Sequence, residues 1–234
     1  MSIAENIAHV RERIAASAAR VHRRPEDIIL MAVTKTVDPD RIRHAYQAGL
    51  RVFGENRVQE FEKKAAALTD LTDAEWHLIG HLQSNKAKKA AELFQAVDSV
   101  DSLHLAQKLN ESARQVGRTL PVLIEIKVSD EASKSGIPVS SPELETLLEA
   151  AATLEHLQIR GLMTVPPYTE DPEGARIYFR LLRDCRDQIA ARRLPQVQMD
   201  VLSMGMSHDF EVVIEEGSTC VRVGTGIFGA RPKP

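Results

Sequence analysis

Apolar residues at the start of the chain recur with the spacing of an amphipathic helix. Successive members of the series are separated by four, three and four positions: Ile3, Ile7, Val10 and Ile14. Residues at this spacing lie on one helical face. Ser2 followed by Glu5 matches a capping box, in which two side chains satisfy free backbone N–H groups at a helix start. We expect a helix that begins near Ser2 and buries its apolar face.

Beyond Pro25 the pattern changes to short apolar or β-branched runs separated by helical stretches. The runs expected to form strands are 28–34, 51–53, 76–80, 96–100, 121–128, 157–164, 198–203 and 219–223. The expected helices are 38–48, 56–68, 83–93, 102–115, 141–153, 173–192 and 208–216. Strands that alternate with helices pair in parallel through right-handed crossovers.

Eight such strands predict an α/β fold, a single (β/α)8 TIM-type barrel over residues 1–234 with an additional N-terminal helix. This helix fills the outer position that follows the last strand. An open, doubly wound sheet is the main alternative, because the runs at 51–53 and 96–100 are weak strand patterns. The sequence contains no linker, repeat or low-complexity tract that would divide the chain.

Composition and charge disfavour several kinds of partner. Aromatic residues make up 4%, the net charge is −3 and the pI is about 6.3, whereas a nucleic-acid-binding protein normally has a basic excess. The basic cluster Lys86, Lys88 and Lys89 is typical of a solvated helix face. Neither a signal peptide nor an apolar run of membrane-spanning length occurs. The two cysteines form no disulfide or metal pattern. We expect a cytoplasmic protein without membrane, nucleic-acid or metal partners.

Two glycine-containing turns near the C-terminus are candidate phosphate sites. Residues 203–207 (SMGMS) and 224–226 (GTG) each follow an expected strand. In this barrel fold, a phosphate often lies between the loops after the seventh and eighth strands. Glycine lets backbone N–H groups approach an anion, and Ser207 and Thr225 add hydroxyl groups. The alternative is that the glycines only form tight turns.

The same C-terminal turn also matches the G-x-G-x-x-G dinucleotide fingerprint at 224–229. That fingerprint requires a helix, a second strand and an acidic residue about 20 positions later. Only five residues follow Gly229, so the match is accidental.

Lys35 follows the first expected strand, at the barrel end where active sites form. Barrel closure brings the first and last strands together, so Lys35 and Gly224 are expected to share one pocket. A lysine opposite a phosphate site is a candidate for a Schiff base with an aldehyde. Together these features predict a site for pyridoxal 5′-phosphate (PLP). A solvated lysine is the alternative reading.

Arg222 lies two residues before Gly224 on the last expected strand and is expected to face the barrel interior. A guanidinium donating to the pyridine nitrogen would keep that nitrogen unprotonated, which disfavours transamination and decarboxylation. The alternative is an ion pair between Arg222 and a carboxylate such as Glu125.

Asn56 and His81 end the second and third expected strands and are expected to line the same mouth. His77 and His81 do not form a metal pair, because four residues of a strand span about 13 Å. His81 is equally compatible with a structural hydrogen-bonding role.

Four segments resemble one known family: AVTKT around Lys35, FGENRVQE at 53–60, WHLIGHLQSNK at 76–86, and the block at 203–231. They are similar to the pyridoxal phosphate homeostasis proteins, which resemble the barrel domain of alanine racemase without its second, β-rich domain. The resemblance implies that Lys35 carries the Schiff base and that Arg222 faces the pyridine nitrogen. It further implies that Ser207, Gly224 and Thr225 hold the phosphate, with Asn56 and Met204 near the cofactor.

This family implies a non-catalytic protein that stores or delivers PLP, with PLP-dependent apoenzymes as partners and a monomeric state. One alternative is an amino-acid racemase of the alanine racemase type. Its second base would be a tyrosine, for which Tyr168 is the candidate. Another alternative is a Schiff-base aldolase that uses no cofactor.

Overall fold

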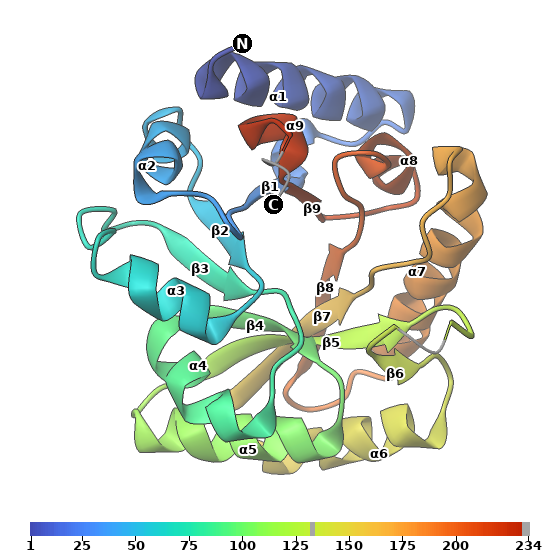
Figure 1. Ribbon diagram of the computed structural model, residues 1–234. Helices are drawn as coiled ribbons and strands as arrows, with labels where there is room; N and C mark the ends of the chain where they lie inside the picture. The colour runs from blue at the N-terminus through green and yellow to red at the C-terminus, as the bar shows by residue number, and fades with distance from the viewer. Residues whose placement is uncertain (132–133, 231–234) are drawn as a thin grey trace.

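The computed structural model describes residues 1–131 and 134–230, and its strands form a closed parallel barrel (Figure 1). The strands run Ile29–Val33 (β1), Val52–Glu55 (β2), Glu75–Leu78 (β3), Ala96–Val100 (β4), Leu120–Lys127 (β5), Ile137–Pro138 (β6), Leu157–Met163 (β7), Val197–Ser203 (β8) and Cys220–Val223 (β9). Around the barrel the order is β1-β2-β3-β4-β5-β7-β8-β9, and β9 pairs with β1 to complete the ring. The expected eight-stranded barrel is confirmed, and the open sheet is excluded.

Helices follow the strands and surround the barrel. Their bounds are Ile3–Arg20 (α1), Pro39–Gln47 (α2), Val58–Ala65 (α3), Ala87–Leu93 (α4), Leu103–Gln115 (α5), Pro142–Ala150 (α6), Arg176–Ala191 (α7), Phe210–Glu215 (α8) and Thr225–Phe228 (α9). Short 3-10 turns precede α4 and α7 and follow α6 (Ser84–Lys86, Pro172–Ala175 and Ala151–Thr153), and a fourth precedes β1 (Pro25–Asp27). None of the helices in the described ranges is both long and apolar enough to cross a bilayer.

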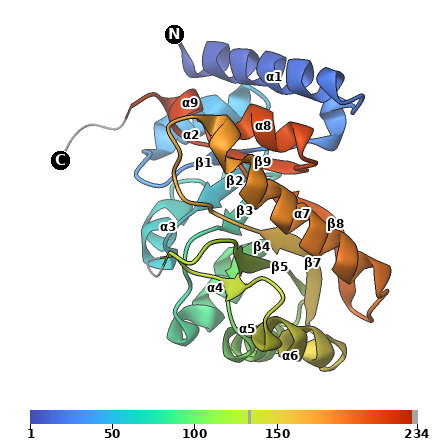
Figure 2. The same ribbon diagram turned by 90° about the vertical axis from the view of Figure 1, so that its right-hand side faces the viewer.

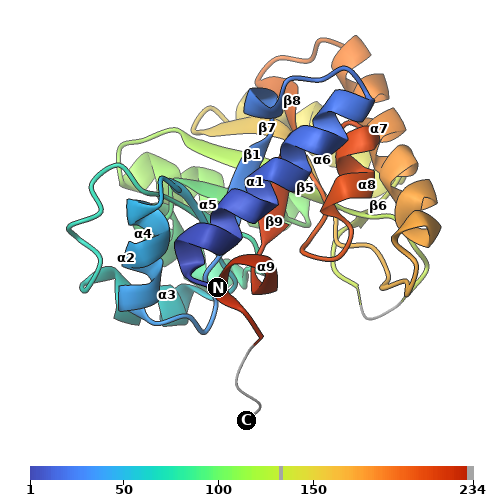
Figure 3. The ribbon, with the colours of Figure 1, turned by 90° about the horizontal axis from the view of Figure 1, so that it is seen from above.

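Helix α1 covers the seam where β9 meets β1, next to α8 and α9 (Figure 3). Its expected capping box is present, since the Glu5 amide donates to the Ser2 hydroxyl at 3.2 Å and the Ser2 amide donates to the Glu5 carboxylate at 2.7 Å. The Asn6 side chain donates to the Ile227 carbonyl at 2.8 Å. The N-terminal helix therefore fills the outer position after the last strand, as expected.

Two short elements were not expected from the sequence. Strand β6 adds two residues beside the end of β5, with Ile137 paired to Ile126. Helix α9 forms a single turn directly after Gly224. Elements this short have no recognisable periodicity, so the sequence pattern does not predict them.

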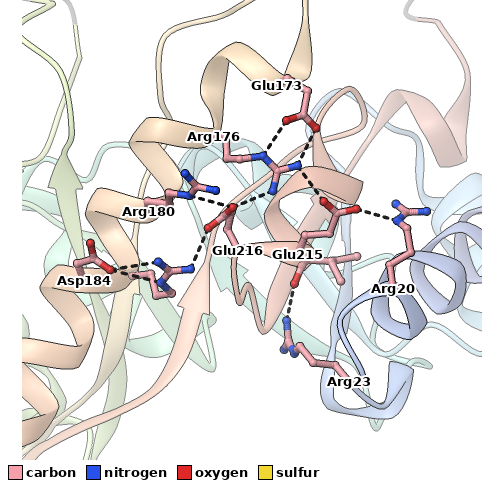
Figure 4. Close-up of polar contacts among 10 residues, drawn as sticks. Arg20, Arg23, Glu173, Arg176, Arg180, Asp184, Glu215 and Glu216 are labelled. Carbon is pink, nitrogen blue, oxygen red and sulfur yellow. Dashed lines mark hydrogen bonds and ion pairs between the residues drawn. The ribbon is translucent and has the colours of Figure 1, made fainter.

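A charged network fixes the end of α8 between α7 and α1 (Figure 4). The Glu216 carboxylate is 5% exposed and accepts from Arg176 at 2.8 Å, Arg180 at 3.1 Å and Arg183 at 2.8 Å. Burial acts to raise the pKa of Glu216, but these guanidinium groups lower it. The network thereby joins α8 to α7, which lies next to it (Figure 2).

Candidate cofactor site

Lys35 lies at the carboxyl end of β1, beside the end of β9. The two strands pair in parallel, with Met31 opposite Arg222 and Ala32 opposite Val223. As a result, Lys35, Gly224 and Thr225 line one small cavity of about 40 Å³. The expected proximity of Lys35 and Gly224 is therefore present in the structure.

The two glycine turns meet at the Ser207 hydroxyl. This oxygen accepts from the Gly224 amide at 3.3 Å and from the Gly226 amide at 3.2 Å. Gly205 adopts φ +91°, which favours glycine, and an added Cβ would lie 2.4 Å from Val213. Backbone N–H groups from the start of α9 thus converge on a hydroxyl, an arrangement suited to a phosphate oxygen.

Thr36 and Arg41 also line the cavity beside Lys35. The donor set itself fits PLP, because it combines a primary amine, converging N–H groups and the buried cation Arg222.

Arg222 is 3% exposed on β9. Its guanidinium donates to the Ser203 hydroxyl at 2.7 Å and to the Thr164 carbonyl at 2.8 Å. Burial lowers the pKa of Arg222, which reflects the cost of placing a cation in the interior. Its hydrogen bonds within the described residues go to these neutral groups, so the alternative of a direct Glu125 ion pair is not realised.

Glu125 nevertheless lies within electrostatic range of Arg222. Burial and the nearby Asp101 carboxylate raise the pKa of Glu125 to about 7, although Arg222 and His81 act to lower it. The interior near Arg222 therefore holds a carboxyl group that changes charge near neutral pH.

A buried ion-pair network fixes the peptide on both sides of Lys35. Lys64 donates to the Glu55 carboxylate at 2.8 Å and to the Thr34 carbonyl at 2.9 Å. Its ammonium also lies 3.0 Å from the Glu60 carboxylate. Glu60 in turn accepts from the Thr36 amide at 2.5 Å. Thr34 and Thr36 flank Lys35 in the chain, so this network holds the Lys35 segment in place.

Glu55 was not identified from the sequence, although it stands at the end of an expected strand within the FGEN segment. A charged residue in a strand covered on both faces is the signal that suggests a buried partner. The sequence does not reveal which of the nearby lysines provides that partner.

The remaining expected site residues are distributed more widely. Met204 is fully buried in the hydrophobic core. Asn56 and His81 line a second cavity of about 800 Å³, which Lys35 does not line. The His81 ring is 58% exposed and lies 3.0 Å from the Asp101 carboxylate. His77 pairs instead with Asp98 at 3.2 Å.

Comparison with known proteins identifies relatives along the entire chain. Residues 2–232 match the family model described as alanine racemase, N-terminal domain. The chain is 46% identical over 232 residues to the pyridoxal phosphate homeostasis protein of Aquifex aeolicus, covering 99% of each. It is 44% identical to the protein of the same name from Escherichia coli, covering 98% of this chain and 97% of the relative.

Solved structures also resemble this chain. The structure of PipY from Synechococcus elongatus with PLP bound is 38% identical, with a TM-score of 0.85, and covers 97% of this chain and 100% of that chain. An alanine racemase from Clostridium difficile, 16% identical with a TM-score of 0.70, shares the fold over 98% of this chain and 58% of its own length. The chain therefore belongs to the pyridoxal phosphate homeostasis protein family and contains the alanine racemase N-terminal domain.

Proposed function

We propose that this protein binds PLP as a reversible Schiff base on Lys35 and serves vitamin B6 homeostasis as a carrier, without catalytic turnover. The observation that carries the proposal is the cavity shared by Lys35, Gly224 and Thr225 at the closure of the barrel. The PLP bound in the related PipY structure supports the choice of cofactor.

Each residue has a defined task in this proposal. The Lys35 amine adds to the aldehyde carbon and water leaves, and hydrolysis reverses the reaction. The Gly224 and Gly226 amides, with the Ser207 and Thr225 hydroxyls, hold the phosphate. Arg222 faces the pyridine nitrogen and keeps it unprotonated, so the bound cofactor is a poor electron sink. Asn56 and Met204 contact the ring region, and His81 lies at the rim of the mouth.

A reversible bond suits storage and delivery. A competing amine or an acceptor apoenzyme removes the cofactor once the Schiff base hydrolyses. We further propose that the protein acts as a monomer.

Borohydride reduction of PLP-loaded protein, followed by peptide mapping, tests the site. We expect the label on Lys35 and none in the Lys35→Ala variant. Lys127→Ala serves as a matched control, because Lys127 lies at the end of another barrel strand. A label on a different lysine, or a protein that binds no PLP, contradicts the proposal.

Incubation of the PLP-loaded protein with L-alanine or L-serine distinguishes a carrier from a racemase. Tyr168 is 75% exposed, with its ring 5.4 Å from that of His208. We expect no D-isomer. Turnover that requires Lys35, with or without Tyr168, would establish an enzyme and refute the carrier function.

A further inference from the structure

The 800 Å³ cavity lined by Asn56 and His81 extends away from the proposed Schiff-base and phosphate groups, because Lys35, Ser207 and Gly224 do not line it. It opens between the start of α3 and the segment that connects β3 to α4. These elements are neighbours on one side of the barrel (Figure 1). Its volume lies within the range of about 300–1,000 Å³ that small-molecule sites occupy.

The wall of this cavity carries excess positive charge. Arg57, Lys63 and Lys86 all line it. Throughout residues 1–131 and 134–230, no side-chain hydrogen bond or ion pair is made by any of these three cations. In contrast, the nearby Lys64 and Lys89 ammonium groups each pair with two carboxylates.

The one carboxylate on the wall does not neutralise this charge. Glu60 accepts from the Thr36 amide and lies 3.0 Å from the Lys64 ammonium. Burial acts to raise the pKa of Glu60, but these contacts and the nearby Arg57 charge lower it. The Glu60 carboxylate thus already has two partners, the Thr36 amide and the Lys64 ammonium.

Backbone and amide donors add to the cations. Arg57, which precedes α3, and the first residues of this helix, Val58 to Glu60, line the cavity. Among the described residues, no side chain caps this helix start. Free N–H groups and the helix dipole at such a start favour an anion. Gln59 and Gln83 supply further amide groups on the same wall.

We infer that this cavity binds a phosphorylated small molecule, with Arg57, Lys63 and Lys86 as its charge partners. Phosphate carries up to two negative charges and several acceptor oxygens, which match three cations and an uncapped helix start. The site is separate from the Ser207 turn, since none of the residues that line it belongs to that turn. The inference goes beyond the carrier function and does not require PLP on Lys35.

Isothermal titration of the PLP-loaded protein with pyrophosphate tests the inference. We expect saturable binding that weakens as salt rises, because the partners are charged and partly exposed. The Lys63→Glu/Lys86→Glu variant should bind at least tenfold more weakly. Lys88→Glu/Lys108→Glu changes the net charge equally at positions outside the cavity and should bind as the wild type does. Circular dichroism and thermal unfolding verify that both variants fold.

A Ser207→Asp variant separates this cavity from the proposed cofactor site. It places a carboxylate in the 203–207 turn and should leave pyrophosphate binding unchanged. If Ser207→Asp no longer binds pyrophosphate while Lys63→Glu/Lys86→Glu still does, the anion binds at the 203–207 turn and the inference is overturned. Citrate that binds as tightly as pyrophosphate would overturn the phosphate preference. A protein that fails to load PLP but binds pyrophosphate through Lys63 and Lys86 would refute the carrier proposal alone.

Discussion

Replacing Lys64 by methionine tests the network that holds the Lys35 segment. The Glu55 side chain is fully buried, and that of Lys64 is 11% exposed. Without the ammonium, the Glu55 carboxylate retains the Thr34 hydroxyl, 2.7 Å from one oxygen. Its other oxygen already lacks a hydrogen-bond partner within the described residues. The variant therefore contains a buried and uncompensated negative charge.

The expected cost follows from this geometry. Removing one partner of a buried ion pair typically destabilises a protein by about 3–5 kcal/mol. In a chain of this size, that corresponds to a fall in Tm on the order of 10 °C. The double variant Glu55→Gln/Lys64→Met removes the charge as well as its partner, and it should recover about 2 kcal/mol or more.

Urea unfolding at pH 7.5 measures both variants against the wild type, provided that the m values agree. Burial already raises the pKa of Glu55, although Lys64 and Thr34 oppose the shift. Loss of Lys64 should raise it further. Because a raised folded-state pKa stabilises the protonated form, the deficit of Lys64→Met should shrink as pH falls towards 5. A loss below about 1 kcal/mol, or a double variant no more stable than the single one, would refute the reasoning.

Three further outcomes are expected. The pKa of Glu125 is raised from 4.5 to about 7, so its contribution to stability is present below pH 4.5 and lost as pH rises through 7. In thermal unfolding at a series of pH values, Glu125→Gln should reduce the change in Tm between pH 4.5 and 7. Gly205→Ala should destabilise the protein by about 1–3 kcal/mol in urea unfolding, because its Cβ would clash with Val213. Gly117→Ala is the control: its Cβ has no contact within 4 Å, so its smaller loss of stability comes only from backbone strain at φ +70°. Glu216→Gln should cost about 1.5–3 kcal/mol by urea unfolding, with a smaller deficit in 1 M salt, since three arginines lose their shared carboxylate.

The alternation of apolar runs with amphipathic stretches was sufficient to predict the barrel. The pattern at 28–34 and 219–223 corresponds to β1 and β9, and the stripe from Ile3 to Ile14 corresponds to α1. These predictions succeed because each depends on residues that lie close together in the sequence. The strand boundaries shift by at most two residues and the helix boundaries by up to four, and the single-turn helix α9 was missed.

The candidate site was predictable only where a local motif marks it. Glycines at 205, 224 and 226 and a lysine after β1 indicated an anion and an amine at strand ends. The Ser207 contact with two amides, and the Lys64 contact with Glu55, carried no local signal. The second cavity was also unforeseen, and Lys86 in its wall resembled an ordinary solvated lysine.

The amino-acid order alone thus determined the elements, their parallel pairing and the family. Only the tertiary structure decided which charges are buried together and which side chains share a cavity. Periodicity reports the environment of a residue along its own helix or strand, which is a local property of the chain. The ion pair between Glu55 and Lys64 depends on how α3 packs over its strand, which the local pattern does not encode.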